Sequence, residues 1–178
     1  SAIAVIRLSG SDSLNVAKKL TKKKNFSNRT ANFVSFFDNK DSIIDRGLII
    51  FFKSPSSYTG EDMLEIHTHG SIAIVNKMFE VLEKSSGCRF ALPGEFSKRA
   101  FINGKNDLIY YHGLANLISS ETEQQRIVAS KQTFGQTKNI CKEWREVIVE
   151  SLAILDSVID FPEEGEDYNL NVIVKNLK

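Results

Sequence analysis

One stretch of the chain alternates apolar and polar side chains residue by residue: Met63-Leu64-Glu65-Ile66-His67-Thr68-His69-Gly70. Because successive side chains of a β-strand point to opposite faces of a sheet, Leu64, Ile66 and Thr68 are predicted to share one face. Glu65, His67 and His69 then share the other face, and Gly70 ends the strand. The pattern predicts a strand that presents one carboxylate and two imidazoles on a single surface.

The residues before this stretch predict two strand-forming regions with a helix between them. A β-branched run over residues 3–8 predicts a strand, and apolar residues at helical spacing over 14–20 predict the helix. Residues 33–37 and 43–52 flank a polar turn, an arrangement typical of a β-hairpin. The strand at 63–69 is therefore expected to be one of several in a sheet.

The residues after the strand at 63–69 again predict both helices and a strand. Apolar residues recur at helical spacing from Ile72 until Gly87, residues 88–92 predict a short return strand, and Pro93 fits the start of another helix. Residues 1–104 are thus predicted to form an α+β domain.

Strand signals disappear after Gly104, and residues 105–178 are predicted to be an all-α segment. Its clearest helix carries one apolar stripe that is predicted to pack in a core: Trp144, Val147, Ile148, Ser151, Leu152, Leu155, Val158 and Ile159. The acidic and then apolar tail at 163–178 suggests a helix that continues beyond this chain.

Composition excludes several classes of protein. Hydrophobic residues make up 42% of the 178 residues and charged residues 25%, which is typical of a globular chain and excludes intrinsic disorder. No apolar run approaches the roughly 18 residues of a membrane helix. A net charge of +1 argues against a protein whose surface mainly contacts nucleic-acid phosphates, although it is compatible with a local basic patch. Cys88 and Cys141 lack a C-x-x-C spacing, and they predict reduced thiols in a cytoplasmic protein.

The chain lacks the motifs of phosphate-binding loops and of nucleophile elbows. No catalytic residue is predicted within it, and residues 1–178 are expected not to hydrolyse a nucleoside triphosphate. Glu65, His67 and His69 have the residue types of a metal site, but His112 is the only other histidine. A polar strand face satisfied by hydrogen bonds is the favoured interpretation, and no metal site is predicted.

A carboxylate on a strand face can instead accept two parallel N–H groups from a guanidine-like heterocycle edge, such as that of a pterin. Glu65 is a candidate for this role. Arg7, near the end of the first predicted strand, and Lys105, after the Asn103-Gly104 turn, are candidates for holding carboxylates or polar oxygens of the same ligand. From the residue types alone, three solvated surface charges remain an alternative.

Four blocks of sequence carry a family resemblance. They read A-V-I-R-L-S-G at residues 4–10, S-Y-T-G-E-D-M-L-E-I-H-T-H-G at 57–70, P-G-E-F-S-K-R-A-F-I-N-G-K at 93–105 and I-D-F-P-E-E at 159–164. In this order they resemble the MnmE family, also called TrmE, of tRNA modification GTPases. The resemblance implies an α+β domain similar to the folate-binding domain of aminomethyltransferases, followed by the first part of a helical domain. It places the GTPase domain after the segment where this chain ends.

The resemblance also implies a ligand site. In the family, an arginine of the first block, the second glutamate of T-G-E-D-x-x-E and the lysine of N-G-K bind a tetrahydrofolate derivative, 5-formyl- or 5,10-methylene-tetrahydrofolate. These positions correspond to Arg7, Glu65 and Lys105, which we call the predicted triad. The implied protein is a cytoplasmic homodimer without a membrane segment. It works with an MnmG-type flavoprotein at carbon 5 of the tRNA wobble uridine, and GTP, magnesium and potassium bind in the GTPase domain.

One block departs from the family pattern, and two alternatives remain. Where the family reads L-D-L-x-Q-A-E-A, this chain ends the corresponding segment with Tyr110-Tyr111-His112-Gly113, which affects the expected contacts of the helical domain. The first alternative is a stand-alone folate-dependent aminomethyltransferase-like protein. The second is an RNA-binding module that uses a basic patch: Lys18, Lys19, Lys22, Lys23 and Lys24.

Overall fold

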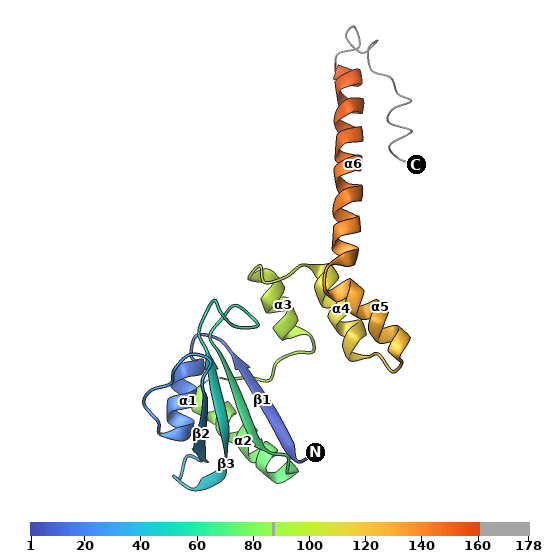
Figure 1. Cartoon of the computed structure of the whole chain (residues 1–178). Coiled ribbons are helices and arrows are strands. Elements are labelled where there is room, and N and C mark those ends of the chain that lie inside the picture. The colour runs from blue at the N-terminus through green and yellow to red at the C-terminus, as the bar shows by residue number, and fades with distance from the viewer. Residues whose placement is uncertain (87, 161–178) are drawn as a thin grey trace. The chain divides into compact units, whose positions relative to one another are not determined.

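The computed structural model describes residues 1–86 and 88–160 (Figure 1). The chain divides into two compact units, Ser1–Asn106 and the part that begins at Asp107. The first combines a sheet with helices, and the helices described in the second are α4, α5 and α6. The chain is therefore an α+β domain followed by a helical segment, as the sequence predicts.

The first unit is built on a four-stranded antiparallel sheet in the order β1-β4-β3-β2. Its strands are β1 (Ile3–Ser9), β2 (Ala31–Phe37), β3 (Ile43–Phe52) and β4 (Met63–His69). Strands β1 and β4 are far apart in sequence but neighbours in the sheet. Their register places Arg7 opposite Glu65.

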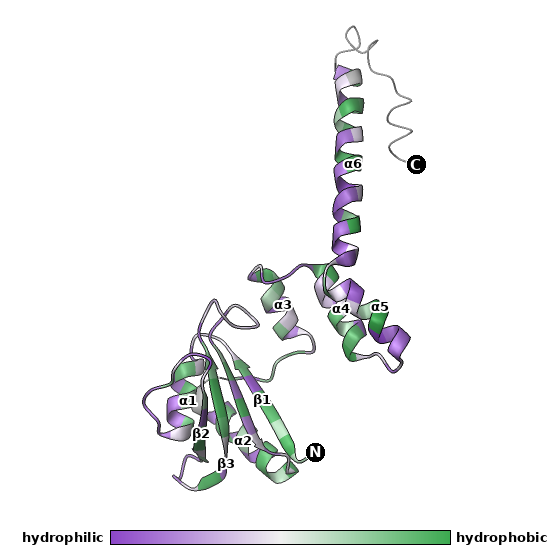
Figure 2. Ribbon diagram, viewed as in Figure 1, coloured by the Kyte–Doolittle hydropathy of each residue, from purple (hydrophilic) through white to green (hydrophobic). Residues whose placement is uncertain are grey.

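Two helices cover one face of this sheet, α1 (Ser13–Thr21) and α2 (Ile72–Ser86) (Figure 1). The face is apolar because alternate strand residues point into it, and Leu64 and Ile66 of β4 are fully buried there. Figure 2 shows the apolar residues along these strands and helices. Twelve buried side chains form the core: Ile6, Val16, Ala17, Leu20, Phe36, Ile49, Phe51, Leu64, Ile66, Met78, Val81 and Leu82.

The other face of the sheet carries the remaining set of alternate residues. The predicted division of β4 is confirmed, because Thr68 is buried with the core residues whereas His67 is only half-buried. Phe33 of β2, on this second face, has 74% of its surface exposed, and Val5 of β1 is also exposed. Both apolar side chains are thus exposed in the described first unit, and this face keeps apolar surface open to solvent.

The predicted return strand at residues 88–92 is wrong, because the chain there is irregular. Arg89 and the backbone N–H of Leu92 both bond to the carboxylate of Glu95, which ties the segment to the next helix rather than to a strand. That helix, α3 (Glu95–Ile102), begins two residues later than predicted from Pro93. Gly94 precedes it with φ +76°, a left-handed conformation that a helix interior excludes.

The second unit contains α4 (Leu108–Ile118), α5 (Glu123–Thr133) and α6 (Gln136–Asp160), as predicted. Asp107 caps α4 by accepting a hydrogen bond from the backbone of Tyr110, and Thr122 caps α5. Helices α4 and α5 approach closely at Gly113, where a Cβ would lie 2.7 Å from the backbone nitrogen of Thr133. Gly113 belongs to the block that departs from the family pattern, and the close packing of α4 and α5 depends on this glycine.

The predicted core packing of the α6 stripe is wrong for the part of α6 that the structure describes. Trp144 is 65% exposed, and Ile148, Leu152 and Ile159 are exposed as well. The helix forms because its local pattern favours one, but the described residues of this unit do not cover its apolar side. The predicted helix at 163–178 lies outside the described residues. None of the described helices is both long and apolar enough to span a membrane.

Candidate functional site

The centre of the candidate site is an ion pair on the helix-free face of the sheet. Arg7 Nε donates to Glu65 Oε1 at 2.8 Å, across the β1–β4 register. The side chain of Arg7 is 56% exposed, whereas that of Glu65 is 16% exposed. Pairing of neighbouring strands thus brings together two members of the predicted triad.

The second oxygen of Glu65 is less completely used. Oε2 lies 3.7 Å from Nε2 of His67, beyond hydrogen-bond distance, and Nε2 is buried without a hydrogen-bond partner among residues 1–86 and 88–160. A carboxylate with a free oxygen beside an unsatisfied imidazole nitrogen has capacity for further polar contacts. This is the arrangement expected of a site that receives a ligand with N–H groups.

His69 does not join this arrangement. Its Nδ1 lies 2.8 Å from Oδ1 of Asp45, and its backbone N–H donates to the other carboxylate oxygen. Burial raises the pKa of Asp45, but the hydrogen bonds from His69, together with one from the backbone of Arg46, leave that pKa lowered. In the part of the chain that the structure describes, no three His, Cys, Asp or Glu side chains are grouped to hold a metal ion.

Lys105, the third member of the triad, lies against the loop before β4. Its Nζ donates to the backbone oxygen of Pro55 at 2.8 Å, while Asn103 donates to the backbone oxygen of Thr59 at 2.7 Å. Gly60 makes this approach feasible, because its φ is +81° and a Cβ there would lie 2.9 Å from Cβ of Asn103. The structure thus brings Lys105 to this loop and not into contact with Arg7 or Glu65.

Polar contacts link the loop to the strand that carries Arg7. The hydroxyl of Ser9 donates to Glu61 at 2.8 Å and lies 2.6 Å from that of Thr59. Arg99 of α3 donates to the same Glu61 oxygen at 2.9 Å. Since Ser9 follows Arg7 by two residues in β1, all three members of the triad are attached to one end of the sheet.

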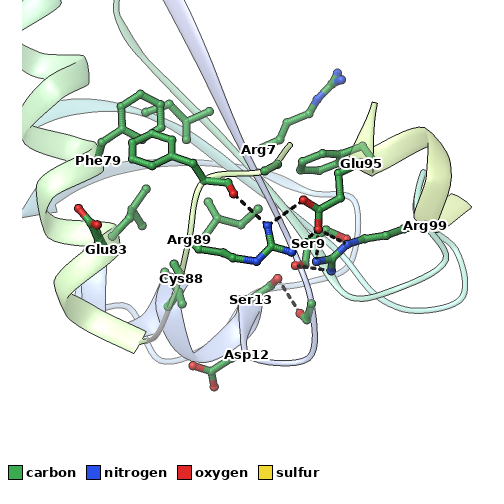
Figure 3. Close-up of a pocket in the computed structure, with 18 of the residues that line it drawn as sticks. Arg7, Ser9, Asp12, Ser13, Phe79, Glu83, Cys88, Arg89, Glu95 and Arg99 are labelled. Atoms are coloured by element: carbon green, nitrogen blue, oxygen red, sulfur yellow. Dashed lines mark hydrogen bonds and ion pairs between the residues drawn. The ribbon is translucent and has the colours of Figure 1, made fainter. Parts of the chain in front are cut away.

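A second ionic group lies beside these contacts, and the sequence analysis missed it (Figure 3). Glu95 accepts two hydrogen bonds from Arg89, one from the backbone of Leu92 and others from Arg99. We call Arg89, Glu95, Arg99 and Glu61 the Glu95 network. Arg89, then Leu92 and Arg99, hold the pKa of Glu95 well below its usual 4.5, although the side chain is only 12% exposed. The signal that could have found it is the i,i+4 spacing of Glu95 and Arg99 on a predicted helix.

A cavity of about 600 Å³ adjoins this network on the outer side of β1. Its walls come from β1, the start of α1, α2 and the segment 88–96, and Val5, Leu8, Phe79 and Phe90 supply apolar surface. Figure 3 shows the guanidinium of Arg7 pointing away from Arg89 and Glu95. Cys88 also lines the cavity, and burial, followed by the charge of Asp12, raises the pKa of its thiol. The volume is that of a small-molecule pocket.

The fold and site define a class of protein: a small α+β unit with a charged site at one end of its sheet, joined to a helical unit. The family model described as GTP-binding protein TrmE N-terminus matches residues 1–105. The model described as MnmE helical domain matches residues 108–178. The chain belongs to the TrmE/MnmE family.

Curated relatives agree with this assignment. The chain is 42% identical over 164 residues to tRNA modification GTPase MnmE of Anaplasma marginale, and 43% identical over 165 residues to that of Aquifex aeolicus. It is 44% identical over 163 residues to that of Parvibaculum lavamentivorans. These alignments cover 91 or 92% of this chain but 37% of each relative. The chain thus spans little more than a third of the length of these proteins.

Proposed function

We propose that this chain is the N-terminal part of a tRNA modification GTPase and that its first unit binds a tetrahydrofolate one-carbon donor. The observation that carries the ligand proposal is Glu65, a largely buried carboxylate with an oxygen free of hydrogen bonds within the described residues. The match of the MnmE helical domain to residues 108–178 supports this over a stand-alone aminomethyltransferase.

The residues of this unit fit a pterin. Two parallel N–H groups of the heterocycle would donate to the carboxylate of Glu65, each oxygen of which has two lone pairs. The unsatisfied Nε2 of His67 lies beside the same carboxylate and adds a polar neighbour for the ring. Bound tetrahydrofolate supplies a one-carbon unit at the formyl or methylene oxidation level.

Arg7 and Lys105 would donate hydrogen bonds to the polar oxygens of the ligand. The terminal nitrogens of Arg7 form no hydrogen bond with the described residues, because only Nε contacts Glu65. Lys105 donates to a single backbone oxygen and has two further N–H groups. Both cations therefore keep donors for a ligand, while the contacts of Ser9 and Asn103 hold their backbones at the same end of the sheet.

The proposal for the whole protein follows from the family. A homodimer would form through the first unit, whose helix-free sheet face exposes Phe33 and Val5. The protein would bind GTP with magnesium and potassium in a domain beyond this chain. It would act in the cytoplasm with an MnmG-type flavoprotein at carbon 5 of the wobble uridine of tRNA.

Calorimetric titration with 5-formyl-tetrahydrofolate tests the site. Glu65→Gln replaces one acceptor by a donor that faces the ligand's own donors, so we expect binding to weaken by about 2–3 kcal/mol, roughly thirty- to two-hundredfold. Lys105→Ala should cost less, since solvent replaces part of its contact. EDTA should leave binding unchanged.

The matched control is Glu80→Gln, which removes a carboxylate paired with Lys77 and Lys84 on the exposed side of α2. It should bind the folate like the parent. Equal binding by the parent and Glu65→Gln, with the fold intact by circular dichroism, would refute the assignment of this site.

A further inference from the structure

The positive charge of this nearly neutral chain is concentrated in one region of the first unit. Residues 18–53 hold nine Lys and Arg residues against three Asp residues, a net charge of +6, whereas the whole chain has +1. The remainder of the chain is therefore net acidic. A local excess of this size is the electrostatic footprint expected where a polyanion binds.

Five of these cations cluster where α1 ends. Lys18 and Lys19 lie on the exposed side of α1, whose other side is buried through Val16, Ala17 and Leu20. Lys22 then adopts a left-handed conformation with φ 59°, which ends the helix, and Lys23 and Lys24 follow on the surface. The helix end thus presents its lysines outward.

Two of the lysines contact residues near opposite ends of β2. Nζ of Lys22 lies 4.3 Å from the ring centroid of Phe37, at the end of the strand, and 2.7 Å from Asp41. Nζ of Lys23 instead bonds to the side-chain oxygen of Asn32, near the start of the strand, at 2.6 Å. Asn32 and Phe37 are five residues apart in the strand, so the two positions that these lysines contact lie up to roughly 17 Å apart along β2.

Much of this charge is not neutralised. The partner of Lys23 is an uncharged amide, and Lys18 and Lys24 form no ion pair with the residues that the structure describes. Strand β2, whose Asn32 and Phe37 contact Lys23 and Lys22, is an edge of the sheet. Unneutralised lysines gathered at one end of a helix can hold an RNA strand by contacts with its phosphates.

We propose that this surface, the lysine edge (Lys18, Lys19, Lys22, Lys23 and Lys24), binds RNA through its phosphate backbone. The identification of that RNA as tRNA rests on the proposed function. The rival role for lysines at an edge strand is to prevent sheet edges of separate molecules from pairing. The two roles predict different results when the charges are removed.

The test is binding of a tRNA transcript to the full chain by fluorescence anisotropy between 50 and 200 mM salt. The triple variant Lys18→Gln, Lys23→Gln and Lys24→Gln should bind about tenfold or more weakly at the lower salt concentration. The slope of log affinity against log salt should fall by about two, because up to three phosphate contacts are lost.

The control triple, Lys98→Gln, Lys131→Gln and Lys142→Gln, removes the same charge from exposed positions elsewhere and should change affinity less than twofold. Equal effects of the two triples would overturn the proposal. So would unchanged tRNA binding together with new self-association of the first triple in sedimentation, which is the result for edge protection. Folate titration of the same variants keeps the two proposals apart, because the lysine edge variants should bind folate like the parent.

Discussion

Two charged groups at the same end of the sheet differ in how fully their hydrogen bonds are used. In the pair of Arg7 and Glu65, one bond joins the side chains and both partners keep unused donors or acceptors within the described residues. In the Glu95 network, both oxygens of Glu95 are bonded to arginines, and Arg99 extends the contacts to Glu61. The Arg7–Glu65 pair can therefore still form hydrogen bonds with a ligand. The hydrogen bonds of the Glu95 network instead join segments of the chain to one another.

The difference also has a topological side. Arg7 and Glu65 belong to adjacent strands that the sheet already holds together. The Glu95 network joins three segments that no β-sheet hydrogen bonds connect: the irregular segment at 88–92, α3 and the loop before β4. We therefore expect the network to matter for stability and the pair to matter for binding.

The largest effect on stability is expected from Arg99→Ala. It removes hydrogen bonds to both Glu95 and Glu61, and we expect the free energy of unfolding to fall by about 2 kcal/mol. Urea unfolding of the full chain measures it. The control Arg126→Ala breaks an exposed pair with Glu123 on α5 and should cost less than about 0.5 kcal/mol. Equal losses in the two variants would contradict the structural role of the network.

A somewhat smaller effect is expected from Gly60→Ala. The left-handed conformation costs roughly 1 kcal/mol for a residue with a Cβ, and that Cβ must also displace Asn103. Gly94→Ala is matched to it, because Gly94 has φ +76° but open space around the new Cβ. Gly60→Ala should therefore be the less stable of the two in urea, and it alone should weaken folate binding by moving Lys105. Equal folate binding by both variants would contradict the proposed position of Lys105.

The stability that Glu95 contributes should depend on pH. Because the pKa of Glu95 is lowered in the folded chain, its contribution to stability is complete above its usual value of 4.5 and is lost as the pH falls below it. The difference in urea midpoint between the parent and Glu95→Gln should be largest at pH 7 and shrink between pH 4.5 and pH 3. A difference that stays constant over this range would argue against an ionised Glu95 as the centre of the network.

The smallest effect on stability is expected from Arg7→Ala. Its pair with Glu65 is a single bond from an exposed guanidinium, so the free energy of unfolding should change by less than about 0.5 kcal/mol. Folate binding should nevertheless weaken, though less than in Glu65→Gln. A variant that lost stability as Arg99→Ala does, while binding folate normally, would reverse the comparison between the two groups.

Local pattern predicted the regular elements well. Alternation over 63–69 was enough to predict β4 and the division between its buried and polar faces, because strand geometry repeats every two residues. The helical spacing after Gly104 likewise predicted an all-α segment. The sequence resemblance nominated Arg7, Glu65 and Lys105, and their role in folate binding stays a prediction.

Tertiary structure decided what depends on distant residues. Arg7 and Glu65 are 58 residues apart, and only the β1–β4 pairing makes them neighbours. The segment at 88–92 has a strand-like sequence, yet Arg89 and the backbone N–H of Leu92 donate hydrogen bonds to the carboxylate of Glu95 instead of joining the sheet. The stripe of α6 predicted its helix correctly and its burial wrongly for the described residues, because a helix is made by bonds within one segment and a core needs a second surface. Periodicity therefore determined the elements, whereas long-range pairing decided which charges meet.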